Sequence, residues 1–468
     1  MVRERSIRLP GRRPVKSWQL TALVGVAGAL VLAGCSSSSS TTTGGSSSTT
    51  SAPAGGASSA TGSTTSGSIV WSASPIAGSG ATDTRTVLIN AFEKKYPNIH
   101  VTLVSAPTNT DTNRATLATQ ISGGSATPDV FMGDVIWPAQ FAAHQLAVPL
   151  SDYLPASYWA QFAPGLVQGA SYKGKVYGSP LFEDQGFMYY RKDLLAKAGL
   201  QPPTTWEQVQ TDAVKLKNAG LVKYGFVFQG ASYEGLTCNF MEYLTSAGGT
   251  ATNSDYTKAN LDSAAAVKAA TFMRGLITSG ATPAAVSTFQ EAQSMSIFAA
   301  GDAAFLRNWD YAYSNATTPA TGKLTASQVG VEPMPAFTGQ PTPGYSNIGG
   351  WNMYINPHSK NINLDLTFIK YLASPEAQTI LATKYSEIPT TTVVRNSPQV
   401  KALNPVLAII SETKLVPRPA GTPNYPALST AIYTNVNAVL AGSASPSAAM
   451  SAAQSQANTA LSSAAGGL

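Results

Sequence analysis

The succession of predicted strands and helices in residues 68–468 constrains the fold more than any other feature of this sequence. A segment of this length is too long for a single hydrophobic core and predicts two domains. Alternating strands and helices are typical of an α/β fold with a largely parallel sheet, which is the fold class that we expect. Hydrophobic spacing predicts strands at 69–71, 99–104 and 129–132, and helices at 84–96 and 112–122.

The same alternation continues to the C-terminus. Thr205 is the expected N-cap of one helix, with Gln208 at its third position. Ser445 is the expected N-cap of the last helix, with Pro446 in its first turn. Strands are predicted at 186–190, 224–228, 303–306, 329–333 and 352–355. Helices are predicted at 191–199, 236–247, 264–279, 288–300, 364–372 and 375–384, and another begins at 206. Two Ala-rich helices are predicted at the C-terminus.

Polar and aromatic residues follow the ends of several predicted strands. In open α/β sheets, ligands bind outside the carboxyl ends of the strands. We therefore group these residues into one candidate site: Asp134, Asp184, Asn308 with Trp309, and Gly350 with Trp351.

The N-terminus has the layout of a secretory signal. A basic head from Arg3 to Lys16 precedes an apolar run over residues 20–33. This run is short for a membrane-spanning helix, which needs about 20 apolar residues. Residues 32–35 read Leu-Ala-Gly-Cys and resemble the lipobox of bacterial lipoproteins. That resemblance implies a signal peptide over 1–34, lipidation of Cys35 and attachment to the outer face of the bacterial cytoplasmic membrane. An uncleaved anchor helix is the alternative, and Sec or twin-arginine export stays open.

Removal of that signal changes the charge of the protein. The whole chain carries 30 Lys and Arg against 24 Asp and Glu, a net charge of +6. Six of the bases and one of the acids precede Cys35, so 24 bases and 23 acids remain, a net charge of +1. This balance gives no argument for binding nucleic acid or an anionic lipid surface. Cys238 would be the remaining free thiol, and we interpret it as a small core residue.

A low-complexity segment separates Cys35 from the predicted domains. Residues 36–67 consist almost wholly of Ser, Thr, Gly and Ala. Such a composition is typical of a flexible tether, with a reach on the order of 30 Å. The tether (35–67, with its lipidated Cys) would hold a folded body near the membrane.

Several short segments together resemble a known family, the extracellular solute-binding proteins of ABC importers, in the group that binds oligosaccharides. Their order and spacing across the body carry the resemblance, and three further segments resemble the trehalose/maltose-binding branch. The first set is 92–101 (FEKKYPNIHV), 128–131 (PDVF) followed by Asp134 and Trp137, 189–195 (YYRKDLL), 205–206 (TW), 307–309 (RNW) and 374–378 (SPEAQ); the second is 225–230 (GFVFQG), 233–236 (YEGL) and 418–419 (RP).

The resemblance implies a two-lobed periplasmic-binding-protein-like fold, with hinge strands and a ligand cleft between the lobes. We expect lobe 1 to comprise 68–177 and 329–395, and lobe 2 to comprise 178–328 and 396–468. It further implies an oligosaccharide ligand, delivery to the membrane subunits of an ABC permease, and a monomer without a cofactor.

A sugar site needs hydroxyl acceptors, a multiple donor and flat rings for stacking. Asp134 matches a family Asp that accepts sugar hydroxyls, and Asp184 matches a second binding carboxylate, although neighbouring Glu183 leaves the register open. Phe182 stands where a Tyr is common in the family, so one hydroxyl contact is expected to be missing. Glu234 has ligand and surface interpretations of equal weight.

The remaining candidate residues would provide aromatic rings, a close backbone approach and a positive charge for the sugar site. Trp309 and Trp351 match the stacking tryptophans of the family, with Asn308 and Gly350 beside them. Arg418 matches a family Arg that reaches into the cleft, with a surface Arg as the alternative. Asp83 is the first acid after the first predicted strand, where it is either a ligand or the cap of the first helix.

The sequence gives less support for an enzyme than for a binding protein. Paired carboxylates also occur in glycosidases, so a cell-wall glycan hydrolase is the alternative from another class, and a binder of peptides or polyamines is a third. No HExxH, CxxC, GxSxG or Walker A motif is present, and the histidines His100, His144 and His358 are scattered. We therefore predict a non-enzymatic sugar binder without a metal site.

Overall fold

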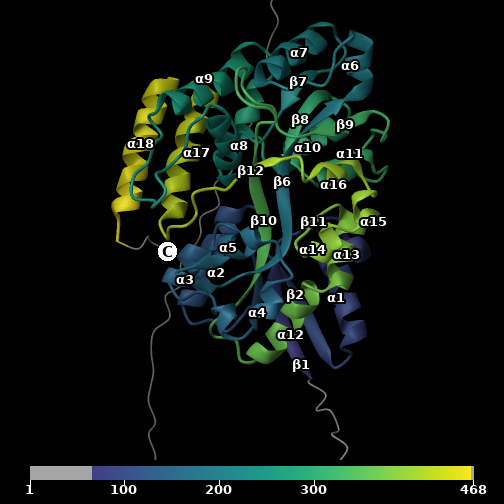
Figure 1. Ribbon diagram of the computed structural model, residues 1–468, viewed down its shortest axis with the longest axis vertical. Helices are drawn as coiled ribbons and strands as arrows, with labels where there is room; N and C mark the ends of the chain where they lie inside the picture. Colours follow the sequence, from purple (N-terminus) through teal and green to yellow (C-terminus); the bar gives the residue numbers. More distant parts are fainter. Residues whose placement is uncertain (1–65, 465–468) are drawn as a thin grey trace, which may run out of the picture. The chain divides into compact units, whose positions relative to one another are not determined.

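The computed structural model describes residues 66–464 (Figure 1). The predicted signal peptide, Cys35 and the tether as far as residue 65 lie outside the described residues. Within them, no helix combines the length and the apolar character that crossing a bilayer requires.

One lobe is built on three parallel strands in the order β2 (Ile99–Ser105), β1 (Gly67–Ala73) and β3 (Val130–Asp134). Buried apolar side chains such as Ile69, Trp71 and Phe131 lie on these strands, and helices α1 (Thr84–Lys95) and α12 (Ile362–Leu372) cover them. The ring of Phe368 lies edge-on to Trp71 and to Phe92, at centroid distances of 5.2 and 5.0 Å. These aromatic contacts fix the helices on the sheet.

The second lobe is built on the parallel pair β7 (Tyr224–Val227) and β8 (Ala303–Trp309). Its helix α7 (Trp206–Asn218) begins at Thr205 with the predicted capping box to Gln208. The C-terminal helices α17 (Tyr425–Ala441) and α18 (Pro446–Ser462) pack on α8 (Glu234–Ser246) and α9 (Ala264–Thr278) of this lobe.

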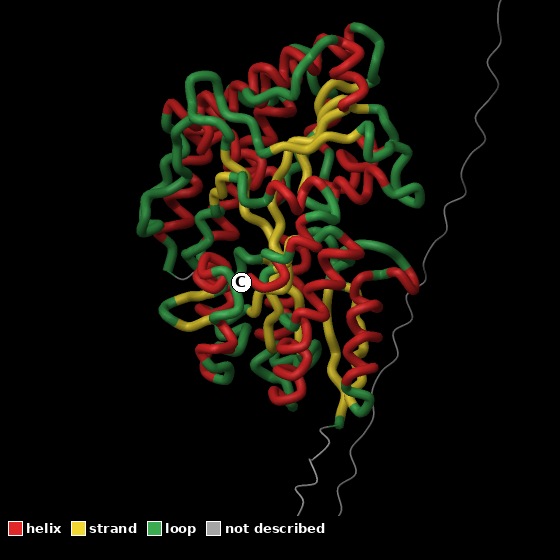
Figure 2. The backbone as a smooth tube through the Cα atoms, turned by 45° about the vertical axis from the view of Figure 1, so that its right-hand side comes forward, coloured by secondary structure: helices red, strands yellow, loops and turns green. Residues whose placement is uncertain are grey.

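Two long strands, β6 (Ser179–Arg191) and β10 (Tyr345–Ile355), join the lobes (Figure 1). β10 is antiparallel to both β3 and β6, and β6 is antiparallel to β8. The prediction of a largely parallel sheet is therefore wrong, because the chain runs through the hinge in opposite directions and makes one mixed sheet, in the order β2-β1-β3-β10-β6-β8-β7. Figure 2 shows the strands running through the middle of the described body, with helices around them.

The two-lobed α/β fold is confirmed, and most predicted elements occur within a few residues of their expected bounds. The remaining elements are the 3-10 helices η1 (Gly80–Thr82), η2 (Leu150–Asp152) and η3 (Ala284–Thr288), the strands β4 (Ser171–Tyr172), β5 (Lys175–Val176), β9 (Val329–Glu332), β11 (Ile388–Pro389) and β12 (Lys414–Val416), and the helices α2 (Thr110–Ser122), α3 (Pro138–Ala143), α4 (Ala156–Trp159), α5 (Pro164–Gly169), α6 (Lys192–Ala198), α10 (Glu291–Ala299), α11 (Ala312–Thr317), α13 (Pro375–Tyr385), α14 (Thr392–Arg395), α15 (Pro398–Lys401) and α16 (Pro405–Ile409).

A buried ion pair ties β8 to α8. Arg307 Nε lies 2.9 Å from Glu242 Oε2, and Arg307 Nη1 donates to Gln229 Oε1 at 2.6 Å. The side chains of Arg307 and Glu242 are 1% and 0% exposed. Each charge therefore depends on the other for the hydrogen bonds that it would otherwise make with water.

Replacement of one partner tests this dependence. We expect Glu242→Ala to lower the free energy of unfolding by about 3–5 kcal/mol, because it leaves Arg307 charged and buried. Glu376→Ala is the matched control, since Glu376 is 49% exposed and lies 3.5 Å from Lys95; it should cost less than about 1 kcal/mol. Urea unfolding measures both, and equal losses would contradict the interpretation.

Candidate ligand-binding site

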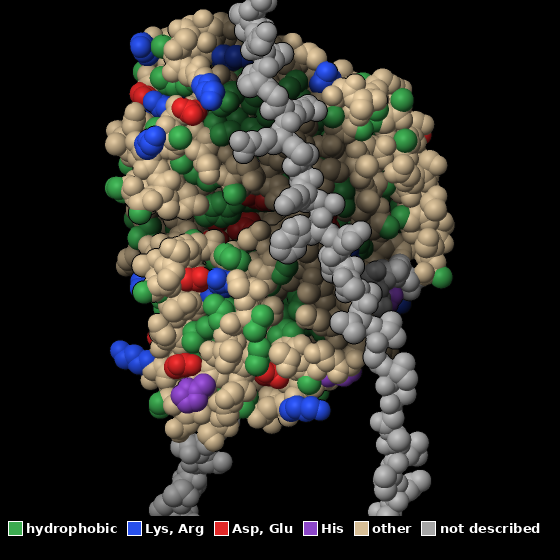
Figure 3. Space-filling model, turned by 180° about the vertical axis from the view of Figure 1, so that it is seen from behind, with side chains coloured by type: hydrophobic (Ala, Val, Ile, Leu, Met, Phe, Trp, Pro, Cys, Tyr) green, Lys and Arg blue, Asp and Glu red, His purple; other side chains and the backbone are tan. Residues whose placement is uncertain are grey.

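A polar cavity lies where the two lobes and the hinge strands meet. It has a volume of about 70 Å³ and adjoins a larger cavity of about 430 Å³, with which it shares Asp184, Trp309 and Trp351. Figure 3, which views the body from behind, shows Asp and Glu side chains in a hollow near the middle of that side. The smaller cavity contains seven of the predicted site residues: Asp134, Asp184, Glu234, Trp309, Gly350, Trp351 and Arg418.

Cross-strand pairing brings these residues together, which differs from the expectation that all of them follow strand ends. Asp134 and Trp309 are the last residues of β3 and β8, but Asp184 lies inside β6 and Trp351 inside β10. Trp351 pairs with Asp134 across the sheet. Because the hinge strands β6 and β10 pass through both lobes, they face the cavity with their middles, whereas β3 and β8 reach it with their last residues.

Arg418 links carboxylates from the two lobes. Its Nη2 lies 2.8 Å from Asp134 Oδ1, and its Nη1 lies 2.9 Å from Glu234 Oε1. Asp134 ends β3 of the first lobe, Glu234 begins α8 of the second, and Arg418 follows the hinge strand β12. The side chains of all three are at least nine-tenths buried. The interpretation of Arg418 as a surface residue is therefore wrong, and Glu234 is not a surface residue either.

Further hydrogen bonds hold the two acids. Ser429 Oγ donates to Glu234 Oε2 at 2.6 Å, and the Tyr425 hydroxyl also donates to Glu234. Thr110 Oγ1 donates to Asp134 Oδ2 at 3.1 Å. Burial nevertheless raises the pKa of Glu234 to about 7, since loss of hydration outweighs the attraction of Arg418.

Asp184, and not Glu183, faces the cavity. Glu183 points to Arg395, whose Nη1 lies 2.7 Å from Glu183 Oε2. Asp184 lines both cavities, and its Oδ1 has no hydrogen-bond donor within reach among the described residues. Burial raises the pKa of Asp184 to about 7. Phe182, two residues earlier on β6, lines the larger cavity.

The two tryptophans are held differently. Trp309 is 7% exposed, and the guanidinium of Arg307 lies over its ring at 4.1 Å. Trp351 is only partly buried and lines both cavities. Gly350 has a φ of +122°, and a Cβ there would lie 2.6 Å from the carbonyl oxygen of Phe182. This glycine is therefore required for the close approach of β10 to β6.

Two predicted site residues do not line these cavities. The side chain of Asn308 points to the helix α10, where its Nδ2 lies 3.3 Å from Ser294 Oγ. Asp83 caps α1 and lies within 2.9 Å of Arg85 Nε. These contacts favour the capping interpretation of Asp83.

Sequence reasoning missed several lining residues. Glu291 begins α10, and Glu387 directly precedes β11. Cys238, interpreted as core, is buried but lines the smaller cavity from α8. The hydrophobic periodicity of the sequence does not indicate that Glu387 lines the site. The position of Glu291 at the start of a predicted helix could have indicated that it does. The other missed residues in the two cavity walls include Thr108, Thr110, Tyr233, Tyr311 and Asn315.

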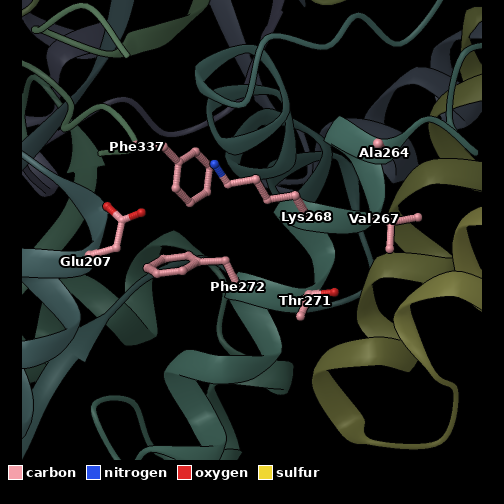
Figure 4. A pocket seen from close by; sticks show the side chains of 7 residues that line it. All are labelled: Glu207, Ala264, Val267, Lys268, Thr271, Phe272 and Phe337. Carbon is pink, nitrogen blue, oxygen red and sulfur yellow. The ribbon is translucent and has the colours of Figure 1, made fainter. Parts of the chain in front are cut away.

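Two other cavities are weaker candidates. One of about 570 Å³ lies between α7 and α9, where Lys268 extends towards Phe337, and it contains none of the predicted site residues (Figure 4). The other, of about 700 Å³, touches Phe182 and Arg418 but contains none of the predicted carboxylates. The polar cavity between the lobes is thus the candidate site.

Comparison with known families identifies the protein class. The family model described as "Bacterial extracellular solute-binding protein" matches residues 78–379. The chain belongs to this family. A protein of Deinococcus radiodurans named "Probable ABC transporter-binding protein" is 34% identical over 378 residues, which cover 78% of this chain and 88% of that protein. This solute-binding protein is therefore of the kind that serves ABC transporters.

Solved structures of similar solute-binding proteins have the same fold. The maltose-bound MalE3 of T. maritima aligns with a TM-score of 0.76 and 32% identity, over 84% of this chain and 99% of that chain. The GacH receptor of Streptomyces glaucescens, solved unliganded and with acarbose, aligns with a TM-score of 0.74 and 26% identity, over 85% of this chain and 99% of that chain.

The glycine at position 350 provides a stability test. We expect Gly350→Ala to destabilise the protein by several kcal/mol, because the new Cβ meets the Phe182 backbone and adopts an unfavourable φ. Gly124→Ala is the control, since Gly124 has a φ of +81° but open space around it; it should cost only about 1–2 kcal/mol. Similar losses of unfolding free energy in both variants would contradict the close-approach argument.

The raised pKa of Glu234 predicts a pH dependence. The folded protein holds this proton up to about pH 7, whereas the unfolded chain releases it near the ordinary value of 4.5. Between these values the folded state binds more protons, so Glu234 makes stability fall as the pH rises. Glu234→Gln should flatten that decline by up to about 1.4 kcal/mol per pH unit. Urea unfolding from pH 5 to pH 8 measures it, with Glu376→Gln as the exposed control; an unchanged slope would contradict the pKa shift.

Proposed function

We propose that this solute-binding protein captures a sugar, a disaccharide such as maltose or trehalose, and presents it to the permease of an ABC importer. One observation carries the proposal: carboxylates, an arginine and two tryptophans from both lobes converge on one cavity. The solute-binding proteins with similar structures include ones solved with maltose, acarbose and α-D-tagatose.

The residue types fit the chemistry of a sugar. Asp134, Asp184 and Glu234 supply acceptors for hydroxyl groups, and Arg418 supplies donors. Trp309 and Trp351 supply flat faces for the C–H surface of a sugar ring. Phe182 provides apolar contact without a hydroxyl.

Ligand capture would proceed by closure of the lobes about the hinge strands. Asp134 and Glu234 approach the cavity from opposite lobes, so a sugar that contacts both binds the closed state more tightly than the open state. Such a ligand shifts the population towards closure. We propose the lobe boundaries given above, 68–177 with 329–395 and 178–328 with 396–468, as the bodies that move.

The same proposal covers the placement of the protein. A lipid on Cys35 and the tether that follows would keep the body at the outer face of the cytoplasmic membrane, as a monomer within reach of the permease. Binding, and not catalysis, is the proposed activity. Membership of the family of bacterial extracellular solute-binding proteins supports this choice.

A thermal-shift screen tests the ligand class. Maltose, trehalose, sucrose and maltodextrins are added to the full chain, and we expect at least one to raise the Tm in a concentration-dependent way. Trp351→Ala should weaken that sugar about threefold to tenfold, because aromatic contacts contribute about 0.5–1.5 kcal/mol. Glu376→Gln is the distant control and should bind normally.

Two outcomes would reject the proposal. A Tm that responds to peptides or polyamines and to none of the sugars would indicate a different solute. Release of monosaccharide from the bound disaccharide, detected by chromatography, would indicate a glycan hydrolase.

A further inference from the structure

Three carboxylates form a tight cluster at the edge of the larger cavity. Asp184 lies on β6, Asp310 directly follows β8, and Glu387 directly precedes β11. One oxygen of each lies within 4.8 Å of the others. Both β8 and β11 pair with β6 next to these positions, through Gly186 with Trp309 and through Glu183 with Ile388. The backbone therefore holds the three acids together.

The cluster is buried and lacks donors. Asp184, Asp310 and Glu387 are 7%, 0% and 1% exposed. Among the described residues, no donor from outside the cluster reaches Asp184 Oδ1, Asp310 Oδ2 or either oxygen of Glu387, and Asp184 lies within hydrogen-bonding reach of Asp310 and Glu387. The backbone N–H of Gln185 donates to the other oxygen of Asp310, at 3.3 Å. Buried carboxylate oxygens without donors are costly unless a cation or a proton satisfies them.

The nearby protein cations are already engaged elsewhere. Arg395 pairs with Glu183, Arg307 with Glu242, and Arg418 with Asp134 and Glu234. In the part of the chain that the structure describes, no ion pair involves Asp184, Asp310 or Glu387. Any negative charge on these three acids is therefore balanced by no side-chain cation among the described residues.

We propose that Asp184, Asp310 and Glu387 bind a hard divalent cation, Ca²⁺, beside the solute cavity. Carboxylate oxygens are the ligands that Ca²⁺ prefers, at about 2.3–2.6 Å, so ligand oxygens lie within roughly 5 Å of one another. The spacing in this cluster fits that range. Asp184 and Glu387 also line the larger cavity, from which water would complete the coordination of the ion.

The competing explanation is that protons neutralise the cluster. Burial and mutual repulsion raise the pKa of both Asp310 and Glu387 well above its ordinary value. Protonated carboxyl groups would hydrogen-bond one another and need no metal. The two explanations differ in one measurable property, which is the response of the folded protein to Ca²⁺ at constant pH.

The test uses the full chain without sugar, freed of metal with EDTA and dialysed. We expect CaCl₂ at micromolar to millimolar concentrations to raise the Tm progressively at pH 7.5, relative to NaCl of equal ionic strength. Isothermal titration calorimetry should give about one Ca²⁺ per chain. A Tm and a calorimetric trace that do not respond to Ca²⁺, or a response to Mg²⁺ alone, would overturn the proposal.

Variants locate the site. Asp310→Asn and Glu387→Gln should each weaken Ca²⁺ binding at least tenfold, while the exposed control Glu376→Gln should leave it unchanged. Both substitutions remove a buried negative charge, so the metal-free variants should unfold at a Tm no lower than that of the wild type. Undiminished Ca²⁺ binding in both variants would exclude the cluster as the site.

The experiment is independent of the identity of the solute. A Ca²⁺ response without any sugar response leaves the cation site in place and rejects the sugar. A sugar response without Ca²⁺ binding rejects the cation site and leaves the sugar in place.

Discussion

Arg418 stands between two buried acids that belong to different lobes, and the geometry of the cleft depends on this arrangement. Its guanidinium lies 2.8 Å from Asp134 and 2.9 Å from Glu234. A planar guanidinium can serve two carboxylates at once, whereas the single ammonium of a lysine cannot do so with the same geometry. In this conformation the two contacts connect the lobes at one point in the cavity wall.

The hinge strands explain why the site lies in the middle of the sheet. β6 and β10 extend through both lobes in opposite directions, and cross-strand pairing sets Trp351 beside Asp134 and beside Phe182. Gly350 permits this approach, because any larger residue would meet the Phe182 carbonyl. A mixed sheet therefore does more than link two bodies: it supplies the floor of the cavity that lies between them.

Local sequence patterns predict much of this fold, and the reasons for the errors are physical. Capping at Thr205 and Ser445 depends on residues three positions apart, so the sequence alone locates both helix starts. Strand direction depends on which distant segments pair, and hydrophobic spacing carries no such information. Seven of the predicted site residues line one cavity, whereas Asn308, which also belongs to a family segment (307–309), turns instead to Ser294.

The acids at Asp310 and Glu387 show the limit of sequence reasoning most clearly. They lie far apart in the chain, and neither belongs to a motif, so the sequence alone carries no signal that they form a cluster. Pairing of β8 and β11 with β6 is what places both beside Asp184. Near Arg418 the buried acids share a protein cation, but here they share none. The same cleft thus contains one group of acids that shares a protein cation, Arg418, and one group that shares none and requires a proton or a metal ion.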